Sequence, residues 1–281
     1  MPELPELETV MRGLEPVMTG HKITDVWLGE KGLRSPFPDG LTERLTGKKI
    51  VRLSRRAKYI LVDLADDNVL VLHLGMSGRV RIERPGSNAP AEKHDHFKLA
   101  LDGGTQVTLN DARRFGMVFD LPANDLPIHR AFKDLGPEPL DSEFGPDYLS
   151  AKLKNKTQPI KLAIMDQRVV VGVGNIYASE ALHRAGISPK RQAGRISRAR
   201  LIQLVEEIRN VLNDAIADGG SSLRDHRTAY GEFGYFQQRL SVYARAGQPC
   251  KACKEQTGET YLIEKAVQGG RATYYCPHCQ K

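Results

Sequence analysis

The chain carries two Cys-x-x-Cys pairs near its C-terminus, Cys250 with Cys253 and Cys276 with Cys279, and it has no other cysteine. Each pair can direct two thiolates at one point, and two pairs supply the four soft ligands of a tetrahedral zinc ion. No secretory leader is visible, so a metal is favoured over disulfides. We expect one closed structural zinc site, in which His278 is surplus once four thiolates are bound.

The residues between the two pairs predict a β-hairpin. Residues 260–267 and 271–275 have strand-like patterns, and Gln268-Gly269-Gly270 supplies a turn. Such a hairpin can hold Arg271 towards a partner. Zinc ribbons also mediate protein contacts, so this element alone leaves the kind of partner open.

In the rest of the chain, the pattern of apolar residues changes from strand-like to helical part-way along. Seven short segments rich in β-branched residues indicate strands, joined by turns at 66–68 and 102–104, and predict an antiparallel sandwich or barrel. After a Pro/Gly/Asp-rich stretch, helical periodicity dominates, and Gly219-Gly220 ends the last long helix. We expect an α+β protein with a β-sandwich domain at 1–131, a linker at 132–150, a helical domain at 151–240 and a zinc finger at 241–281.

The first residues, MPELPELETV, are typical of an amphipathic helix. Apolar residues recur at three- and four-residue steps, Pro5 suits the first turn, and Glu6 and Glu8 complement the positive end of the helix dipole. Pattern alone favours this purely structural interpretation.

The charge of the chain favours a polyanionic partner. The formal net charge is +7 and the pI about 9.2; residues 43–58 hold seven Lys or Arg against one acid, and residues 190–200 hold five more. Such runs are also typical of ordinary solvated faces. No run of eighteen apolar residues is present, so we expect no membrane span and a cytoplasmic protein.

Eight motifs occur in one order along the chain: MPELPELETV, RRAKY (55–59), HLGMSG (73–78), KHDH (93–96), DARRFG (111–116), LGPEPL (135–140), GVGNIYASE (172–180) and the Cys-x-x-Cys pairs. Together they closely resemble the bacterial formamidopyrimidine-DNA glycosylase family. The resemblance covers essentially the whole chain. It implies a bifunctional repair enzyme that removes oxidised purines from double-stranded DNA and cuts the abasic site. It also implies an N-terminal β-sandwich with a leading helix, a helix-two-turn-helix domain and a zinc finger.

The resemblance also assigns catalytic roles. Removal of Met1 exposes the amine of Pro2 as the nucleophile, Glu3 is the proton donor, and Glu6 is a supporting carboxylate. Lys58 is implied in β-elimination and Arg271 in δ-elimination. Glu8 is expected to have only a structural role in the helix.

Further residues are implied in DNA binding. The gap left by a flipped base is filled by Met76, Arg113 and Phe115. Met76 and Phe115 could equally belong to the hydrophobic core, where methionine and phenylalanine are common. Arg224 belongs to a segment, 221–236, that matches the loop closing over the base, together with Tyr230 and Phe233. Contacts to the DNA backbone are implied for His73, His94, Lys156, Asn175 and Tyr243. Plain helix capping is a second interpretation of Asn175.

Two features depart from the family pattern. Twenty-two residues separate the Cys-x-x-Cys pairs, more than is usual, and Ala112 stands where proline is common. We expect the extra residues to lengthen the tip of the hairpin, which puts the register of Arg271 in question.

Two other functions stay open. One is an endonuclease VIII-like glycosylase for oxidised pyrimidines, and the other is a non-catalytic binder of damaged DNA. We expect a monomer that is associated with the bacterial nucleoid.

Overall fold

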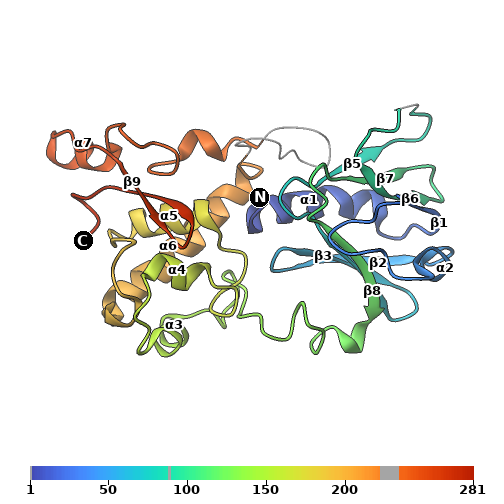
Figure 1. Ribbon diagram of the computed structural model, residues 1–281, viewed down its shortest axis with the longest axis horizontal. Helices are drawn as coiled ribbons and strands as arrows, with labels where there is room; N and C mark the ends of the chain where they lie inside the picture. Colours follow the sequence, from blue (N-terminus) through green and yellow to red (C-terminus); the bar gives the residue numbers. More distant parts are fainter. Residues whose placement is uncertain (1, 88–89, 222–233) are drawn as a thin grey trace. The chain divides into compact units, whose positions relative to one another are not determined.

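The computed structural model describes residues 2–87, 90–221 and 234–281. It divides into two compact units, residues 1–133 with 216–237 and residues 134–215 with 238–281. Strands dominate the first unit and helices the second, which confirms the expected α+β class (Figure 1). Within the described part of the chain, no helix is both long and apolar enough to cross a membrane.

The first unit contains two four-stranded antiparallel sheets. One sheet has the strand order β1 (Ile23–Leu28), β6 (Asp95–Leu101), β7 (Gln106–Asn110), β5 (Arg79–Glu83). The other has the order β2 (Ile50–Arg56), β3 (Tyr59–Leu64), β4 (Asn68–His73), β8 (Met117–Pro122). Seven of these strands were expected from short segments rich in β-branched residues. The eighth, β8, shows only two buried positions in six residues, so its pairing with β4, rather than its own pattern, defines it.

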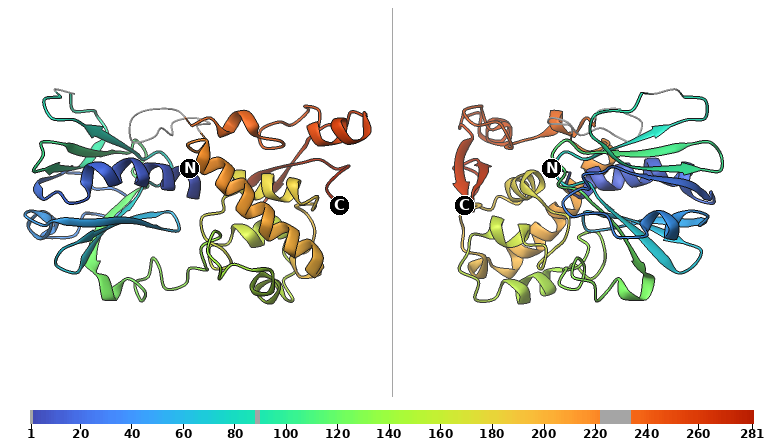
Figure 2. Two further views of the ribbon diagram at one scale, coloured as in Figure 1. Left: turned by 180° about the vertical axis from the view of Figure 1, so that it is seen from behind. Right: turned by 45° about the vertical axis from the view of Figure 1, so that its right-hand side comes forward.

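The helix α1 (Leu4–Met18) shares one core with both sheets. Its buried face carries Leu7, Val10 and Leu14, which belong to the same apolar cluster as Leu53 of β2 and Phe97 of β6. Both views of Figure 2 show α1 running alongside the strands. This packing fixes the start of the helix against the sandwich. A short helix, α2 (Leu41–Leu45), and a 3₁₀ turn at Ala123–Asp125 complete the unit.

The second unit is built from helices and one two-stranded sheet. The helices are α3 (Pro146–Leu153), α4 (Ile160–Met165), α5 (Asn175–Arg184), α6 (Arg198–Ala217) and α7 (Lys251–Thr257), with 3₁₀ turns at Ala193–Arg195 and Phe236–Arg239. The helix α6 is the long one in Figure 2. Gly219 and Gly220 follow it with φ of +75° and +83°, which confirms the predicted glycine stop.

The zinc-finger hairpin corrects one expectation. Its strands, β9 (Glu264–Gln268) and β10 (Arg271–Tyr275), join through a two-residue turn at Gly269 and Gly270, whose φ values are +54° and +72°. Two consecutive glycines at positive φ favour such a tight turn, so the predicted long tip is wrong. Residues 254–263 instead lie between Cys253 and the hairpin, in the end of α7 and in the segment that leads to β9. Arg271 pairs with Gln268 at the end of the ladder, so its register is well defined.

Candidate functional site

The start of α1 places Pro2 and Glu3 in a protected position. Both residues are buried, and Glu3 is the N-cap of the helix. The Glu6 carboxylate reaches back and accepts the Glu3 N–H at 2.8 Å, in a capping-box arrangement. The same sequence features that predict a helix start therefore also fix the backbone beside Pro2.

Glu6 makes a second contact that the sequence did not suggest. Its other oxygen accepts the N–H of Ser221 at 2.7 Å. A Cβ added to Gly220 would lie only 3.2 Å from Glu6, so the close approach requires glycine there. Glu6 thus joins the helix start to the residues that enter segment 222–233. Arg224, Tyr230 and Phe233 belong to that segment and lie outside the described residues.

Lys58 occupies the two-residue turn between β2 and β3, where Ala57 has φ of +53°. The turn is braced by Arg55, which donates to the Ala57 carbonyl at 3.1 Å and to the Glu8 carboxylate at 2.8 Å. Glu8 also pairs with Arg12 at 2.9 Å, so it has the structural role that was expected. Its contact with Arg55 ties α1 to the hairpin that carries Lys58.

His73 lies at the end of β4, in the electrostatic surroundings of Lys58. Burial, together with the charges of Lys58 and Arg34, lowers the pKa of His73 to about 4. Its Nδ1 accepts the Gly75 N–H at 3.0 Å, and its ring lies 4.8 Å from that of Tyr59. A neutral imidazole that accepts at Nδ1 carries its proton on Nε2, so His73 is prepared to donate one hydrogen bond.

Three predicted gap-filling residues project from two neighbouring loops. Met76 is 42% exposed and Phe115 is 41% exposed, so the alternative that they are core residues is wrong. The guanidinium of Arg113 lies over the Phe115 ring, 4.7 Å from its centroid. A Cβ on Gly75 would meet the Phe115 backbone at 2.4 Å, which shows how closely the loops of Met76 and Phe115 approach.

Asp111 anchors both loops and was missed as an individual residue in the sequence. Its fully buried carboxylate accepts the Ser77 hydroxyl at 2.6 Å, the Gly116 N–H at 2.8 Å and the Arg113 N–H at 3.3 Å. One side chain thus holds the loop of Met76 and the loop of Arg113 and Phe115. Its place within DARRFG was visible, but its burial was not.

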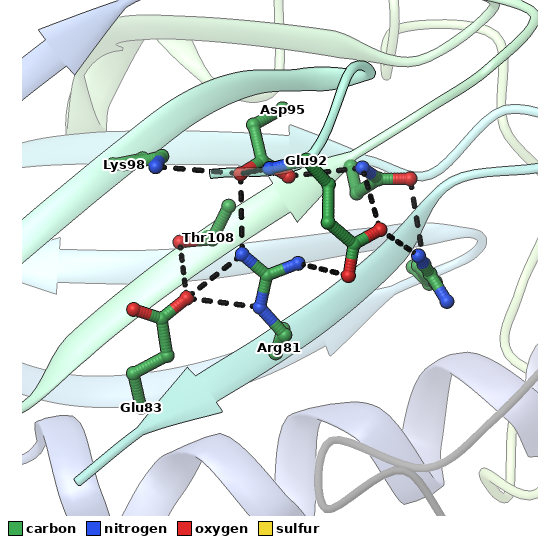
Figure 3. Close-up of polar contacts among 8 residues, drawn as sticks. Arg81, Glu83, Glu92, Asp95, Lys98 and Thr108 are labelled. Carbon is green, nitrogen blue, oxygen red and sulfur yellow. Dashed lines mark hydrogen bonds and ion pairs between the residues drawn. The ribbon is translucent and has the colours of Figure 1, made fainter. Parts of the chain in front are cut away.

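His94 is held through its backbone carbonyl and lies next to a polar network. The Asp111 N–H donates to its carbonyl at 2.9 Å, and its neighbour Asp95 belongs to a polar network on β5, β6 and β7. Figure 3 shows Arg81 at the centre, contacting Glu92 at 2.6 Å and Asp95 at 3.1 Å. Burial opposes ionisation of Asp95, but hydrogen bonds from Asn110 and the Glu92 N–H, and the charge of Arg81, hold its pKa below the ordinary value.

In the second unit, Asn175 is the first residue of α5 but does not cap it. The N-cap is Gly174, and no side-chain capping bond is made, so the capping interpretation is wrong. The Asn175 Nδ2 donates to the Ala272 carbonyl at 2.9 Å instead. Ala272 follows Arg271 in β10, so Asn175 contacts the strand that carries Arg271. Arg271 itself is exposed.

Tyr243 lies against the same hairpin, with its ring 5.1 Å from that of Tyr274. Its backbone N–H donates to Glu180 at 2.8 Å, and this buried carboxylate also accepts the N–H groups of Ser241 and Val242. Glu180 lies within the GVGNIYASE motif, but the sequence did not predict a role for it. Lys156 lies in a separate turn after α3, where its carbonyl accepts the Gly194 N–H at 2.9 Å.

The four cysteines form a site that fits zinc. Their sulfurs all lie within 4.8 Å of one another, with Cys250 and Cys279 3.9 Å apart and Cys253 and Cys276 3.5 Å apart. Tetrahedral Zn–S bonds of about 2.3 Å require sulfurs roughly 3.8 Å apart. His278 Nδ1 lies 3.4 Å from the Cys253 sulfur, so it contacts a ligand while four thiolates complete the set.

Comparisons with known proteins cover nearly the whole chain. Family models match at residues 1–118 (Formamidopyrimidine-DNA glycosylase N-terminal domain), 135–227 (Formamidopyrimidine-DNA glycosylase H2TH domain) and 260–281 (Zinc finger found in FPG and IleRS). A formamidopyrimidine-DNA glycosylase of Dinoroseobacter shibae is 49% identical over 290 residues, with 100% of both chains covered. The chain belongs to the formamidopyrimidine-DNA glycosylase family. The family's fold, its enzyme class and a single structural zinc ion agree with the expectations from the sequence.

Two solved structures of family members share the fold over 100% of both chains at 34% identity. One is a mutant Lactococcus lactis enzyme in complex with a Fapy-dG-containing DNA, with a TM-score of 0.90. The other is the wild-type Lactococcus lactis enzyme in complex with an oxidised-pyrimidine-containing DNA, with a TM-score of 0.88.

Proposed function

We propose that this protein is a bifunctional DNA glycosylase of base excision repair. It removes oxidised purines, notably 8-oxoguanine and formamidopyrimidines, from double-stranded DNA and then cuts the strand by β,δ-elimination. The observation that carries the proposal is the start of α1, where Pro2 and Glu3 are buried and the Glu6 carboxylate accepts the Glu3 N–H. A helix that needed only a cap would not require a proline before a buried acid.

The nucleophile is the amine that Pro2 gains when Met1 is removed. An α-amino group with a pKa near 7.8 is roughly one-seventh neutral at pH 7, whereas for a free lysine near 10.4 the neutral fraction is below about one in a thousand. The amine bonds to C1′ of the damaged nucleotide as the C1′–N bond to the base breaks, and the amine proton passes to the departing base. The C1′–O4′ bond then opens, with Glu3 donating its proton to O4′, as the nitrogen lone pair forms the C1′=N bond.

The secondary amine gives an iminium ion that keeps its positive charge. That charge accepts the electron pair released when the C2′ proton is removed, and the 3′ phosphate departs. A second elimination releases the 5′ phosphate. Lys58 serves as proton donor and phosphate contact in β-elimination. Arg271 clamps a phosphate during δ-elimination, because a guanidinium holds its proton beyond pH 12 and is a poor acid.

The two anchored loops fill the gap that the flipped base leaves. Met76 and Phe115 wedge into the stack, and the Arg113 guanidinium donates to the acceptors of the orphaned base. Exposure of all three side chains on loops held by Asp111 supports this role.

Contacts to the DNA backbone come from both units. His73 donates through Nε2, and His94, Lys156, Asn175 and Tyr243 contribute further contacts; we include Arg224 on its motif alone. The N-terminus of α5, at Asn175, also presents backbone N–H groups to a phosphate.

Borohydride trapping on an 8-oxoguanine duplex tests the enzyme. We expect a covalent adduct with the wild type after full Met1 removal, no adduct with Pro2 acetylated, and a strongly reduced yield with Glu3→Gln. Absence of an adduct from the processed wild type, with duplex binding retained, would favour the non-catalytic binder.

A panel of duplexes with oxidised purines or oxidised pyrimidines separates the two glycosylase alternatives. We expect faster excision of the purine lesions, as kcat/KM in single-lesion assays. The reverse order would place the protein with the endonuclease VIII-like enzymes.

We also propose that the protein acts as a monomer on nucleoid DNA. One copy supplies every side chain named above. Light scattering of the purified protein should give a mass near 31.2 kDa, and a stable dimer would contradict the proposal.

A further inference from the structure

One lysine of the second unit is fully buried. Lys161, in α4, has no exposed surface, and lysine is among the residue types that are least often buried without partners. Its ammonium donates to three oxygens that come from two other elements: Asn175 Oδ1 at 2.6 Å, Thr273 Oγ1 at 2.8 Å and the Ala272 carbonyl at 3.1 Å. Lys161 therefore joins α4, the first turn of α5 and β10.

This contact fixes the orientation of the Asn175 amide. An ammonium can only donate, so the Asn175 atom that faces it has to be the carbonyl oxygen. The amide nitrogen then faces the other way, where it donates to the Ala272 carbonyl at 2.9 Å and approaches the Tyr243 hydroxyl at 3.5 Å. Without Lys161 the amide is free to rotate by half a turn, which would present its oxygen to these groups.

The same ammonium also holds the start of β10. The Ala272 carbonyl accepts from both Lys161 and Asn175, and Thr273 is fully buried beside them. Arg271 immediately precedes these two residues and is exposed. The adjacent turn rests on the same helix, because a Cβ on Gly269 would lie 3.2 Å from the Leu162 side chain.

We propose that Lys161 is a positioning residue for the δ-elimination step. It touches no DNA itself, and it acts by holding the strand from which Arg271 projects and by setting the Asn175 amide. This inference rests on the proposed function, in which Arg271 clamps the phosphate of the second elimination.

The test measures the ratio of β,δ- to β-elimination product formed from a duplex with an abasic site. The reaction is run under single-turnover conditions with enzyme in excess. Lys161→Met keeps the side-chain stem and removes the ammonium. We expect the ratio of β,δ to β product to fall roughly tenfold, as one charged hydrogen-bond donor at a buried site is lost. Lys152→Met, an exposed lysine of α3, is the matched control and should keep the wild-type ratio.

A double variant separates positioning from general loss of structure. If Lys161 acts through Arg271, Lys161→Met combined with Arg271→Ala should give the same ratio as Arg271→Ala alone. Zinc content, and borohydride adduct yield at enzyme concentrations that saturate the duplex, should stay near the wild-type values, because neither reports on δ-elimination. A wild-type ratio in folded, zinc-loaded Lys161→Met, or additive effects in the double variant, overturns the inference.

Should Lys161→Met fail to fold, Thr273→Val decides in its place. It keeps the buried shape and removes one acceptor, so a smaller fall of the ratio supports the inference and a wild-type ratio overturns it. A wild-type enzyme that forms no adduct refutes the proposed function, and with it the inference. Adduct formation with an unchanged ratio in the variants refutes the inference alone.

Discussion

The Glu6 carboxylate is buried, and its two oxygens accept hydrogen bonds from two different N–H groups. One belongs to Glu3 and the other to Ser221, so the side chain controls both the helix start and the entry to segment 222–233. A glutamine at this position keeps one acceptor and turns an NH₂ group towards the second N–H.

Glu6→Gln should therefore lower the free energy of unfolding by about 1–3 kcal/mol, the cost of leaving a buried donor unsatisfied. It should also slow the formation of the borohydride adduct, because the backbone beside Pro2 loses its anchor. Urea unfolding and trapping kinetics measure the two effects. Glu15→Gln, on the exposed face of the same helix, is the control. Equal stability and equal trapping in both variants would contradict the anchoring role.

His73 makes the stability of the protein depend on pH. Its pKa falls from the ordinary value of 6.5 to about 4 in the folded protein, so the unfolded chain binds the proton more tightly. The stabilisation is complete above pH 6.5 and is lost as the pH falls towards 4.

Between pH 7.5 and pH 5 the wild type should lose about 2 kcal/mol more unfolding free energy than His73→Gln does. Urea denaturation at both pH values measures this difference. Protonation of other groups and loss of zinc affect both proteins, so the comparison isolates one imidazole. Parallel loss in the two proteins would show that His73 titrates normally in the folded state.

At the scale of elements, the loop of DARRFG contains a turn in which Ala112 occupies a position that suits proline. The Arg114 N–H donates to the Asp111 carbonyl at 3.2 Å, which makes Ala112 the second residue of a four-residue turn. Proline is favoured at this position because its φ is already fixed at the required value.

Ala112→Pro should raise the free energy of unfolding by about 0.4–1 kcal/mol, through a less flexible unfolded chain. Thermal unfolding should show a higher Tm, while excision of 8-oxoguanine stays unchanged. Ala123→Pro is the contrasting variant outside the loop, because it removes the Ala123 N–H that donates to the Asp67 carbonyl at 2.8 Å, and it should lower the Tm. A lower Tm for Ala112→Pro would mean that the N–H of Ala112 is needed in the folded state.

Elements were predictable from the sequence where a local pattern decides them. The apolar runs of β3 and β4, the apolar face of α1 and the glycines after α6 all appear where expected. The hairpin tip was wrong because a count of residues between two cysteine pairs does not tell on which side of the metal the extra residues lie. Glycines 269 and 270 and the helix-forming run 251–257 hold that information.

The site was predictable as a set of motifs but not as a set of contacts. The four cysteines could be assigned from their spacing, whereas roles for Pro2 and Lys58 could be predicted because the resemblance places these residues one by one. The partners of Asn175 and Asp111 lie far along the chain, at Ala272 and Ser77, and no local pattern reveals such pairs. Burial of a charged residue, as at Lys161 and Glu180, was equally invisible.

At the scale of the whole molecule, a zinc ion held by the four cysteines would connect folding of the finger with the proposed DNA contacts. The ligands come from both ends of one segment, so the metal closes the loop that contains β9 and β10. Arg271 and Tyr274 both lie in β10, within that loop.

Zinc chelation or Cys253→Ser should weaken binding to an abasic-site duplex by about 1–3 kcal/mol, the usual value of a lost side-chain contact to DNA. Fluorescence anisotropy at fixed salt measures the affinity. Metal content confirms the loss of zinc, and readdition of zinc after chelation should restore binding. Affinity that is independent of zinc would exclude the finger from the interface.

Asp111 has a consequence for how such enzymes can be altered. Since one carboxylate holds the loop of Met76 and the loop of Arg113 and Phe115, neither loop can be replaced without changing what supports the other. Attempts to transplant opposite-base preference from a relative should therefore exchange 73–78 and 111–116 together. Evolution meets the same restriction, because a substitution in one loop is tolerated only when the sequence of the other loop is compatible with it.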